Sequence, residues 1–197
     1  MRGERGQSLV EILAALAILS LLFYVGVPSF RGLRERAALG GASSEMATML
    51  RSLRSRAIAQ GRTVALVFDR APGGWQYGLF ADGDGDGVRS SDIADGTDYP
   101  LAAPARLGER WNGIEFGCLP LSRIRRLPPA SGWTAPPQDP IQFGAAKIVS
   151  FSALGDASTG TLYLSDGRTR MAAIVLFGPT ARVRVFRYDL SSEEWST

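Results

Sequence analysis

The chain has 197 residues, 45% of them hydrophobic, and a formal net charge of +3. These values suit one globular domain with an appendage. The sequence has no histidine and one cysteine, Cys118. It therefore lacks the commonest general base and metal ligand, and it cannot form an intrachain disulfide. We expect neither a histidine-dependent hydrolase nor a zinc enzyme, and the mild positive charge alone does not indicate nucleic-acid binding.

The first predicted element is an apolar helix over Leu9–Val27, interrupted by one carboxylate, Glu11. This run would be about 28 Å long as a helix, close to the hydrocarbon thickness of a bilayer. A cleavable secretory signal is the alternative, but the run ends at Val27-Pro28 without a suitable cleavage site. The sequence therefore predicts a retained membrane helix. Glu11 would cost about 2.5–3.5 kcal/mol in the bilayer unless its charge is compensated.

The helical pattern continues beyond Pro28, which we expect to kink the helix, and through Gly40-Gly41, which we expect to loosen it. Apolar residues recur at three- or four-residue steps, with charged residues on the other face; the apolar set is Leu33, Ala37, Met46, Met49, Leu50, Leu53 and Ala57. Gly61 is a natural C-terminal stop. One long helix from near residue 8 to near residue 60 is predicted, with an amphipathic second half that needs a partner surface.

The pattern then changes to that of strands and turns, which predicts a small antiparallel β domain covering the amphipathic half of the helix. Candidate strands are Thr63–Asp69, Trp75–Ala81, Trp111–Gly117, Ala146–Ser152, Gly160–Asp166, Met171–Phe177 and Ala181–Asp189. Residues 118–140 are rich in proline and are expected to form a long surface loop that faces a partner. The fold class is thus α+β.

Two motifs offer chemistry. Asp82, Asp84 and Asp86, followed by Gly87, match the first half of a calcium-binding EF-hand loop, but Ile93 stands where the loop needs a bidentate glutamate. An acidic turn without metal is the favoured interpretation. Arg182 and Arg184 alternate with valines, so both should lie on one face of a strand, where they would meet either phosphates or solvent. Arg123, Arg125 and Arg126 form a second basic cluster, interpreted as solvated surface. No cofactor-binding motif is found.

The N-terminus, Gly6-Gln7-Ser8-Leu9-Val10-Glu11, resembles the class III signal of type IV pilins and type II secretion pseudopilins, as does the position of Pro28. The resemblance implies that a prepilin peptidase cuts between Gly6 and Gln7 and methylates the new amine of Gln7, where the family usually has Phe. It also implies that Glu11 pairs with the N-terminal amine of a neighbouring subunit. Snorkelling of Glu11 to the membrane interface is the alternative.

The rest of the chain resembles GspH/FimT-type pseudopilins, in the segments Arg51–Phe68, Gly74-Trp75, Phe80–Asp92 and Phe151–Asp166. This resemblance implies a pilin-like fold with no enzymatic activity. It divides the chain into a leader (1–6), a transmembrane and assembly segment (7–30), an amphipathic segment (31–61) and a periplasmic domain (62–197).

The implied function is that of a minor subunit of a type II secretion or type IV pilus-like filament, anchored in the inner membrane by a single span. Its implied partners are the prepilin peptidase, other pseudopilins or minor pilins, and the inner-membrane assembly platform. One alternative is a FimT-like minor pilin that binds DNA through Arg182 and Arg184, although the Gly-Arg-x-Arg element of such proteins reads Ala181-Arg182-Val183-Arg184 here. The other is a membrane-anchored binding protein or enzyme that never polymerises.

Overall fold

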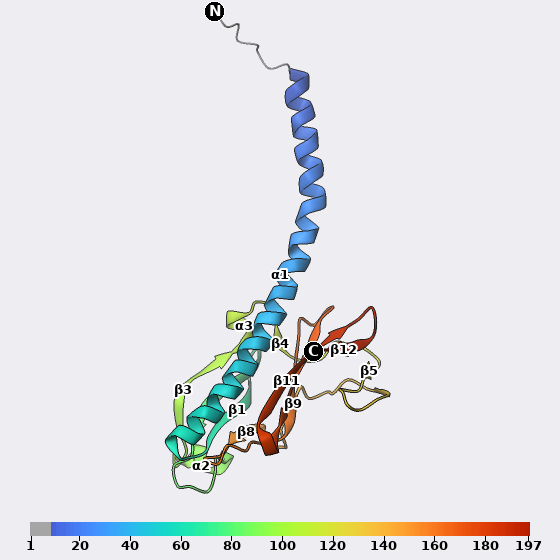
Figure 1. Ribbon diagram of the computed structural model, residues 1–197. Helices are drawn as coiled ribbons and strands as arrows, with labels where there is room; N and C mark the ends of the chain where they lie inside the picture. Colours follow the sequence, from blue (N-terminus) through green and yellow to red (C-terminus); the bar gives the residue numbers. More distant parts are fainter. Residues whose placement is uncertain (1–8) are drawn as a thin grey trace, which may run out of the picture. The chain divides into compact units, whose positions relative to one another are not determined.

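The computed structural model describes residues 9–197, apart from the side chains of residues 23–35. Gly6 and Gln7 lie outside the described residues, as does the side chain of Pro28. The chain divides into two compact units, one ending at Ala37 and one comprising Ala38–Thr197. The fold is α+β and pilin-like, with a long helix followed by antiparallel strands (Figure 1).

Helix α1 runs without interruption over Leu9–Gln60, as the sequence predicts. It ends at Gly61, whose φ of 62° places it in the left-handed region. The amide of Gly61 donates to the carbonyl of Ile58, and the amide of Arg62 donates to that of Ala57, both at 3.3 Å. This pair of bonds is a Schellman cap, which satisfies carbonyls that the helix end would otherwise leave unpaired.

The first sheet has four strands in the order β3-β2-β1-β8. Strands β1 (Val64–Ala71) and β2 (Gly74–Ala81) form the predicted hairpin, and β8 (Ile148–Phe151) pairs with the first half of β1. The edge strand β3 (Tyr99–Arg106) was not predicted. It contains Pro100 and Pro104, which an edge strand tolerates because its outer amides need no partner.

The second sheet has the strand order β12-β11-β10-β9-β4, with β7 also pairing with β9. Its predicted strands are β9 (Gly160–Ser165), β10 (Met171–Phe177) and β11 (Arg182–Asp189). The short strands β7 (Ile141–Gln142) and β12 (Glu194–Ser196) were not predicted. The strand expected over Trp111–Gly117 is reduced to β4 (Glu115–Phe116), because Trp111 instead ends the short helix α3 (Leu107–Arg110).

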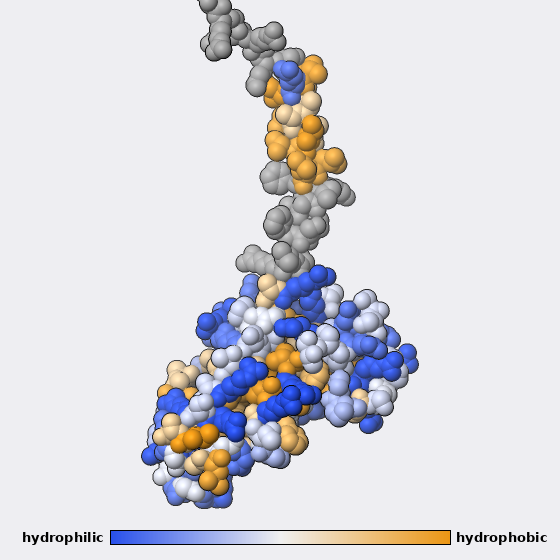
Figure 2. Space-filling model, in the orientation of Figure 1, coloured by the Kyte–Doolittle hydropathy of each residue, from blue (hydrophilic) through white to orange (hydrophobic). Residues whose placement is uncertain are grey.

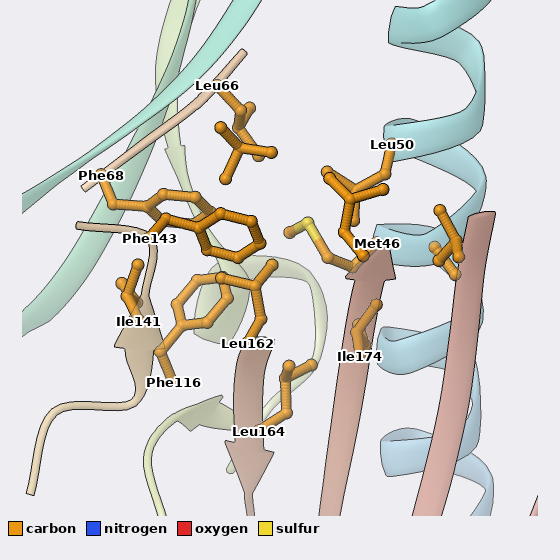
Figure 3. Packing of buried hydrophobic residues seen from close by; sticks show 14 of the residues in the cluster. Met46, Leu50, Leu66, Phe68, Phe116, Ile141, Phe143, Leu162, Leu164 and Ile174 are labelled. Atoms are coloured by element: carbon orange, nitrogen blue, oxygen red, sulfur yellow. The ribbon is translucent and has the colours of Figure 1, made fainter. Parts of the chain in front are cut away.

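The main hydrophobic core lies where α1 packs on both sheets. Met46 and Leu50 of the helix meet Leu66 and Phe68 of β1, together with Ile174 of β10 (Figure 3). Phe116 packs edge-on against Phe68, with ring centroids 5.3 Å apart. The predicted apolar face of the helix is confirmed at Met46, Leu50, Leu53 and Ala57, whereas Ala37 is exposed.

Residues 118–140 differ from the expected surface loop. They contain a small two-stranded sheet, β5 (Ile124–Arg125) with β6 (Trp133–Thr134). Leu119 and Ile124 are buried against the outer face of the second sheet, in a cluster with Tyr163, Phe186 and Tyr188. The segment is therefore largely a cover for that face, because the outer faces of β9–β11 also carry apolar side chains.

Candidate functional site

The first unit presents an exposed apolar helix surface. The large apolar side chains between Leu9 and Leu22 are all about half exposed or more, from 47% for Ile12 to 75% for Leu9 (Figure 2). A helix that is apolar on all sides needs lipid or other helices around it. Glu11 lies in the first turn of this helix, among exposed apolar neighbours.

No helix within the described residues combines the length and apolarity that a membrane crossing needs.

Gly40 and Gly41, the two adjacent glycines of α1, have different surroundings in the second unit. A Cβ on Gly41 would lie 2.1 Å from the Trp111 ring, whereas a Cβ on Gly40 would meet nothing within 4 Å. The Trp111 indole also donates from Nε1 to Glu45 Oε2 at 2.7 Å, and Arg110 forms an ion pair with Glu45 at 3.1 Å. Trp111, the residue that ends α3, thus packs directly against Gly41 of α1. Gly41 does not interrupt the helix.

A groove of about 760 Å³ separates α1 from β2 and β3. Its floor is apolar and includes Leu53 and Leu66, and its rim carries Arg56 and Glu109. The groove is open along most of β3 because that strand contributes small side chains there, from Ala102, Ala103 and Ala105, with Arg106 at its end. Sequence reasoning missed this groove because it had not recognised β3 as a strand.

The acidic loop after β2 is held by its own hydrogen bonds. Asp82 is 5% exposed and accepts from the amides of Gly85 (2.6 Å) and Gly87 (3.0 Å), and also from that of Asp84. Burial alone would raise the pKa of Asp82, but the hydrogen bonds from these backbone amides outweigh it and hold the pKa below its usual value. Asp98, also buried, accepts from the amides of Gly83 and Arg89.

Oxygen atoms of Asp82, Asp84 and Asp86 lie within 4.8 Å of one another. However, both oxygens of Asp82 already accept backbone amides, and Asp86 forms an ion pair with Arg89. These contacts account for the position of the carboxylates without a cation. The interpretation of this motif as an acidic turn without metal stays a prediction.

Arg182 and Arg184 lie as predicted, exposed on the same face of β11, while Val183 faces the main core. Arg182 stands opposite Phe177 of β10, and Arg184 stands opposite Val175. Phe177 is 52% exposed and was not singled out from the sequence. A continuous apolar run does not show which of its residues face outward, but Phe177 is the last residue of β10, directly before the turn at Gly178-Pro179.

In the second basic cluster, Arg123 and Arg125 pack within the fold, although the cluster was expected to be solvated surface. The guanidinium groups of Arg123 and Arg125 stack on the Trp133 ring, 4.3 and 4.4 Å from its centroid, and so join the two strands of the small β5–β6 sheet. Cys118 lies beside this segment, half-buried. Burial raises the pKa of its thiol to about 12, so the reactive thiolate is scarce near neutral pH.

Comparison with protein families gives two matches. Residues 42–115 match the model of type II transport protein GspH, and residues 1–23 match the prokaryotic N-terminal methylation motif. Over residues 42–115 the chain resembles GspH. These matches are consistent with a GspH/FimT-like pseudopilin and confirm the resemblance predicted from the sequence. Comparison with curated proteins and with solved structures found no significant match.

The match to the GspH model runs from the second half of α1 through β1, β2 and β3 to the start of β4. It begins one residue after Gly41 and includes Trp111, the groove beside β3 and the acidic loop. Strands β9–β11, with Arg182, Arg184 and Phe177, lie outside the match. The methylation motif includes Gly6, Gln7 and Glu11.

Proposed function

We propose that this protein is a minor pseudopilin subunit, cut by a prepilin peptidase between Gly6 and Gln7 and assembled through its N-terminal helix. The observation that carries the proposal is the exposed apolar helix surface over Leu9–Leu22, which lies within the segment that matches the methylation motif. The GspH match supports a role in a type II secretion or pilus-like machine. That family is structural, and no enzymatic activity is proposed.

In this proposal residues 1–6 are a leader and residues 7–30 anchor the protein in the inner membrane before assembly. Residues 31–61 and the domain 62–197 lie in the periplasm. The partners are the prepilin peptidase, the inner-membrane assembly platform, and other pseudopilins or minor pilins. Glu11 pairs with the methylated amine of a neighbouring Gln7, because a carboxylate surrounded by apolar side chains is stabilised by a desolvated opposite charge.

The test is the mature N-terminus of protein isolated from its native membrane, measured by intact mass and N-terminal sequencing. A chain that starts at Gln7 supports processing, and an added methyl group supports methylation. A chain that retains Met1 lacks the amine that Glu11 needs. That result would overturn the proposal in favour of an anchored protein that never polymerises.

Glu11 provides the assembly test. Glu11→Ala should reduce incorporation into filaments at least about tenfold, the factor that corresponds to loss of about 1.4 kcal/mol per contact. The thermal unfolding of the domain should stay unchanged, because Glu11 lies outside the second unit. Glu45→Ala is the control: it removes a carboxylate from the same helix within the domain, so it should lower domain stability. Normal incorporation of Glu11→Ala would exclude the ion pair.

A second candidate function is DNA binding during uptake. The specific observation in its favour is that Arg182 and Arg184 are exposed on one face with the half-exposed ring of Phe177, a combination that suits phosphates and a base. The protein should then bind DNA in a salt-sensitive manner, and the double variant Arg182→Ala/Arg184→Ala should abolish binding. No binding of wild-type protein at low salt would exclude this function.

A further inference from the structure

Strand β11 offers an open backbone edge. It pairs with β10 along Arg182–Tyr188, but on its other side β12 reaches only Arg187, Tyr188 and Asp189. Among the described residues, nothing hydrogen-bonds to the backbone of residues 182–186 on that side. Alternate residues of this five-residue stretch therefore present unpaired amides and carbonyls, which can act as a template for another strand.

The other long edges of the two sheets are closed. Edge strand β3 contains Pro100 and Pro104, which lack amide donors. Beyond β8, the amide of Ser158 donates to the carbonyl of Ser150 at 2.9 Å, and the amide of Ser150 donates to Ser158 Oγ at 3.0 Å. Residues 182–186 contain no proline, and no such bonds cover them.

The side chains of this edge select what can pair with it. Arg182 and Arg184 are exposed on the outer face, and no acidic partner of either is found among the described residues. On the inner face Val183 and Val185 belong to the rim of the main core, and Val185 is only partly buried. An added strand would therefore meet positive charge on one face and apolar surface on the other.

A second copy of the chain does not fit this edge. If two β11 edges paired across a twofold axis, arginines of one copy would lie beside arginines of the other, and like charges in neighbouring cross-strand positions are destabilising. The same positions favour an acidic strand, because opposite charges in such pairs are stabilising and carboxylates form charge-assisted bonds with guanidinium groups.

We propose that residues Arg182–Phe186 accept an extended segment of a partner protein, which adds a strand to the second sheet beside β11. The segment carries acidic side chains at alternate positions, facing Arg182 and Arg184, and apolar side chains between them, facing Val183 and Val185. Main-chain hydrogen bonds supply affinity and the alternating side chains supply specificity. The inference rests on the proposed function in that the partner is expected to be another subunit of the assembly.

The experiment uses full-length protein in detergent micelles and fluorescein-labelled peptides, with binding measured by fluorescence anisotropy. The probe is the acidic peptide TVEVEVT, and the matched control is TVKVKVT. A third peptide is TVEVEVT with N-methylated valines, which keeps the charge but loses main-chain donors. We expect the acidic peptide to bind at least about tenfold more tightly than either of the other two, the ratio given by about 1.4 kcal/mol.

Charge reversal tests the site on the protein. Arg182→Glu/Arg184→Glu should reverse the preference, so that TVKVKVT binds better than TVEVEVT. Both residues are exposed, so the substitutions leave the core intact. Arg168→Glu is the control, because Arg168 is an exposed arginine in the turn at the opposite end of β10. It should leave the preference unchanged.

Two results would overturn the proposal. One is the absence of preference for the acidic peptide by wild-type protein. The other is equal binding of the N-methylated acidic peptide together with competition by single-stranded DNA, which would make this face a general polyanion surface. A processed Gln7 terminus with no peptide binding would reject the strand edge alone, whereas an uncut terminus with peptide binding would reject only the pseudopilin proposal.

Discussion

Single contacts at the residue scale explain features that the sequence pattern leaves ambiguous. The pair Gly40-Gly41 was expected to loosen α1, yet Gly41 is the contact surface for Trp111. Hydrogen bonds explain the aspartates of the acidic loop in the same way. The first case depends on a neighbour distant in sequence, because Trp111 lies 66 residues from its hydrogen-bond partner Glu45. The second depends on the local fold of the loop, because Asp82 accepts from amides two to five residues away.

The two glycines give a matched pair of substitutions. Gly41→Ala should lower the free energy of unfolding by about 1–3 kcal/mol, because the new methyl group overlaps the Trp111 ring and forces it to move. Gly40→Ala should be neutral or stabilising by up to about 1 kcal/mol, because alanine has the higher helix propensity and the site is open. Chemical denaturation of both variants would measure the difference. Equal effects would show that Trp111 does not rest on Gly41.

Asp82 gives a second test at this scale. Asp82→Asn should destabilise the domain by about 1–3 kcal/mol at neutral pH, because a buried carboxylate that accepts three amides is replaced by a group with only one acceptor. Asp84→Asn, at an exposed position, is the control. A lowered pKa means that the stabilisation is present above the ordinary aspartate pKa and is lost as pH falls through the folded pKa. The difference between wild type and Asp82→Asn should therefore shrink in acid.

The secondary-structure elements show what sequence periodicity can and cannot predict. The helix and the strands β1, β2 and β8–β11 were predicted within about two residues, because each carries either an apolar run or a regular alternation of apolar and polar residues. Strand β3 was missed because prolines argue against a strand unless its place at a sheet edge is known. The exposed arginines of β11 were predicted from alternation alone, but its open edge depends on how far β12 extends, which is a tertiary feature.

The segment 118–140 provides a prediction for an element. Ile124→Ala should lower the free energy of unfolding by about 2–5 kcal/mol, because Ile124 is 2% exposed and its loss leaves a cavity above the second sheet. Leu154→Ala should change it little, because Leu154 is 93% exposed. Thermal or denaturant unfolding measures both. A negligible effect of Ile124→Ala would mean that the segment does not cover the sheet.

The chain has no histidine, the side chain that commonly titrates near neutral pH. Its resolved pKa shifts lie toward the two ends of the scale. Hydrogen bonds lower the pKa of Asp82 and Asp166 despite burial, whereas burial raises the pKa of Cys118 and of Tyr163 to about 12. The stability of the domain should therefore depend little on pH between about 6 and 8.

Outside that pH window the stability of the domain falls on both sides, for different reasons. In acid the unfolded chain binds more protons than the folded one, so stability falls as the carboxylates with lowered pKa are protonated. In alkali the folded chain retains the protons of Cys118 and Tyr163, so stability falls once pH exceeds their ordinary pKa values. Melting temperatures across the pH range would test this plateau. A melting temperature that changes sharply between pH 6 and 8 would contradict it.

The arginines of β11 also affect whether copies of this subunit can add to one another through the second sheet. A subunit whose open edge repels its own kind cannot extend its second sheet by adding copies of itself, so this edge cannot sustain a homopolymer. A strand added to this edge must instead come from a chain of different charge. Two side chains can thus decide which subunit extends the second sheet.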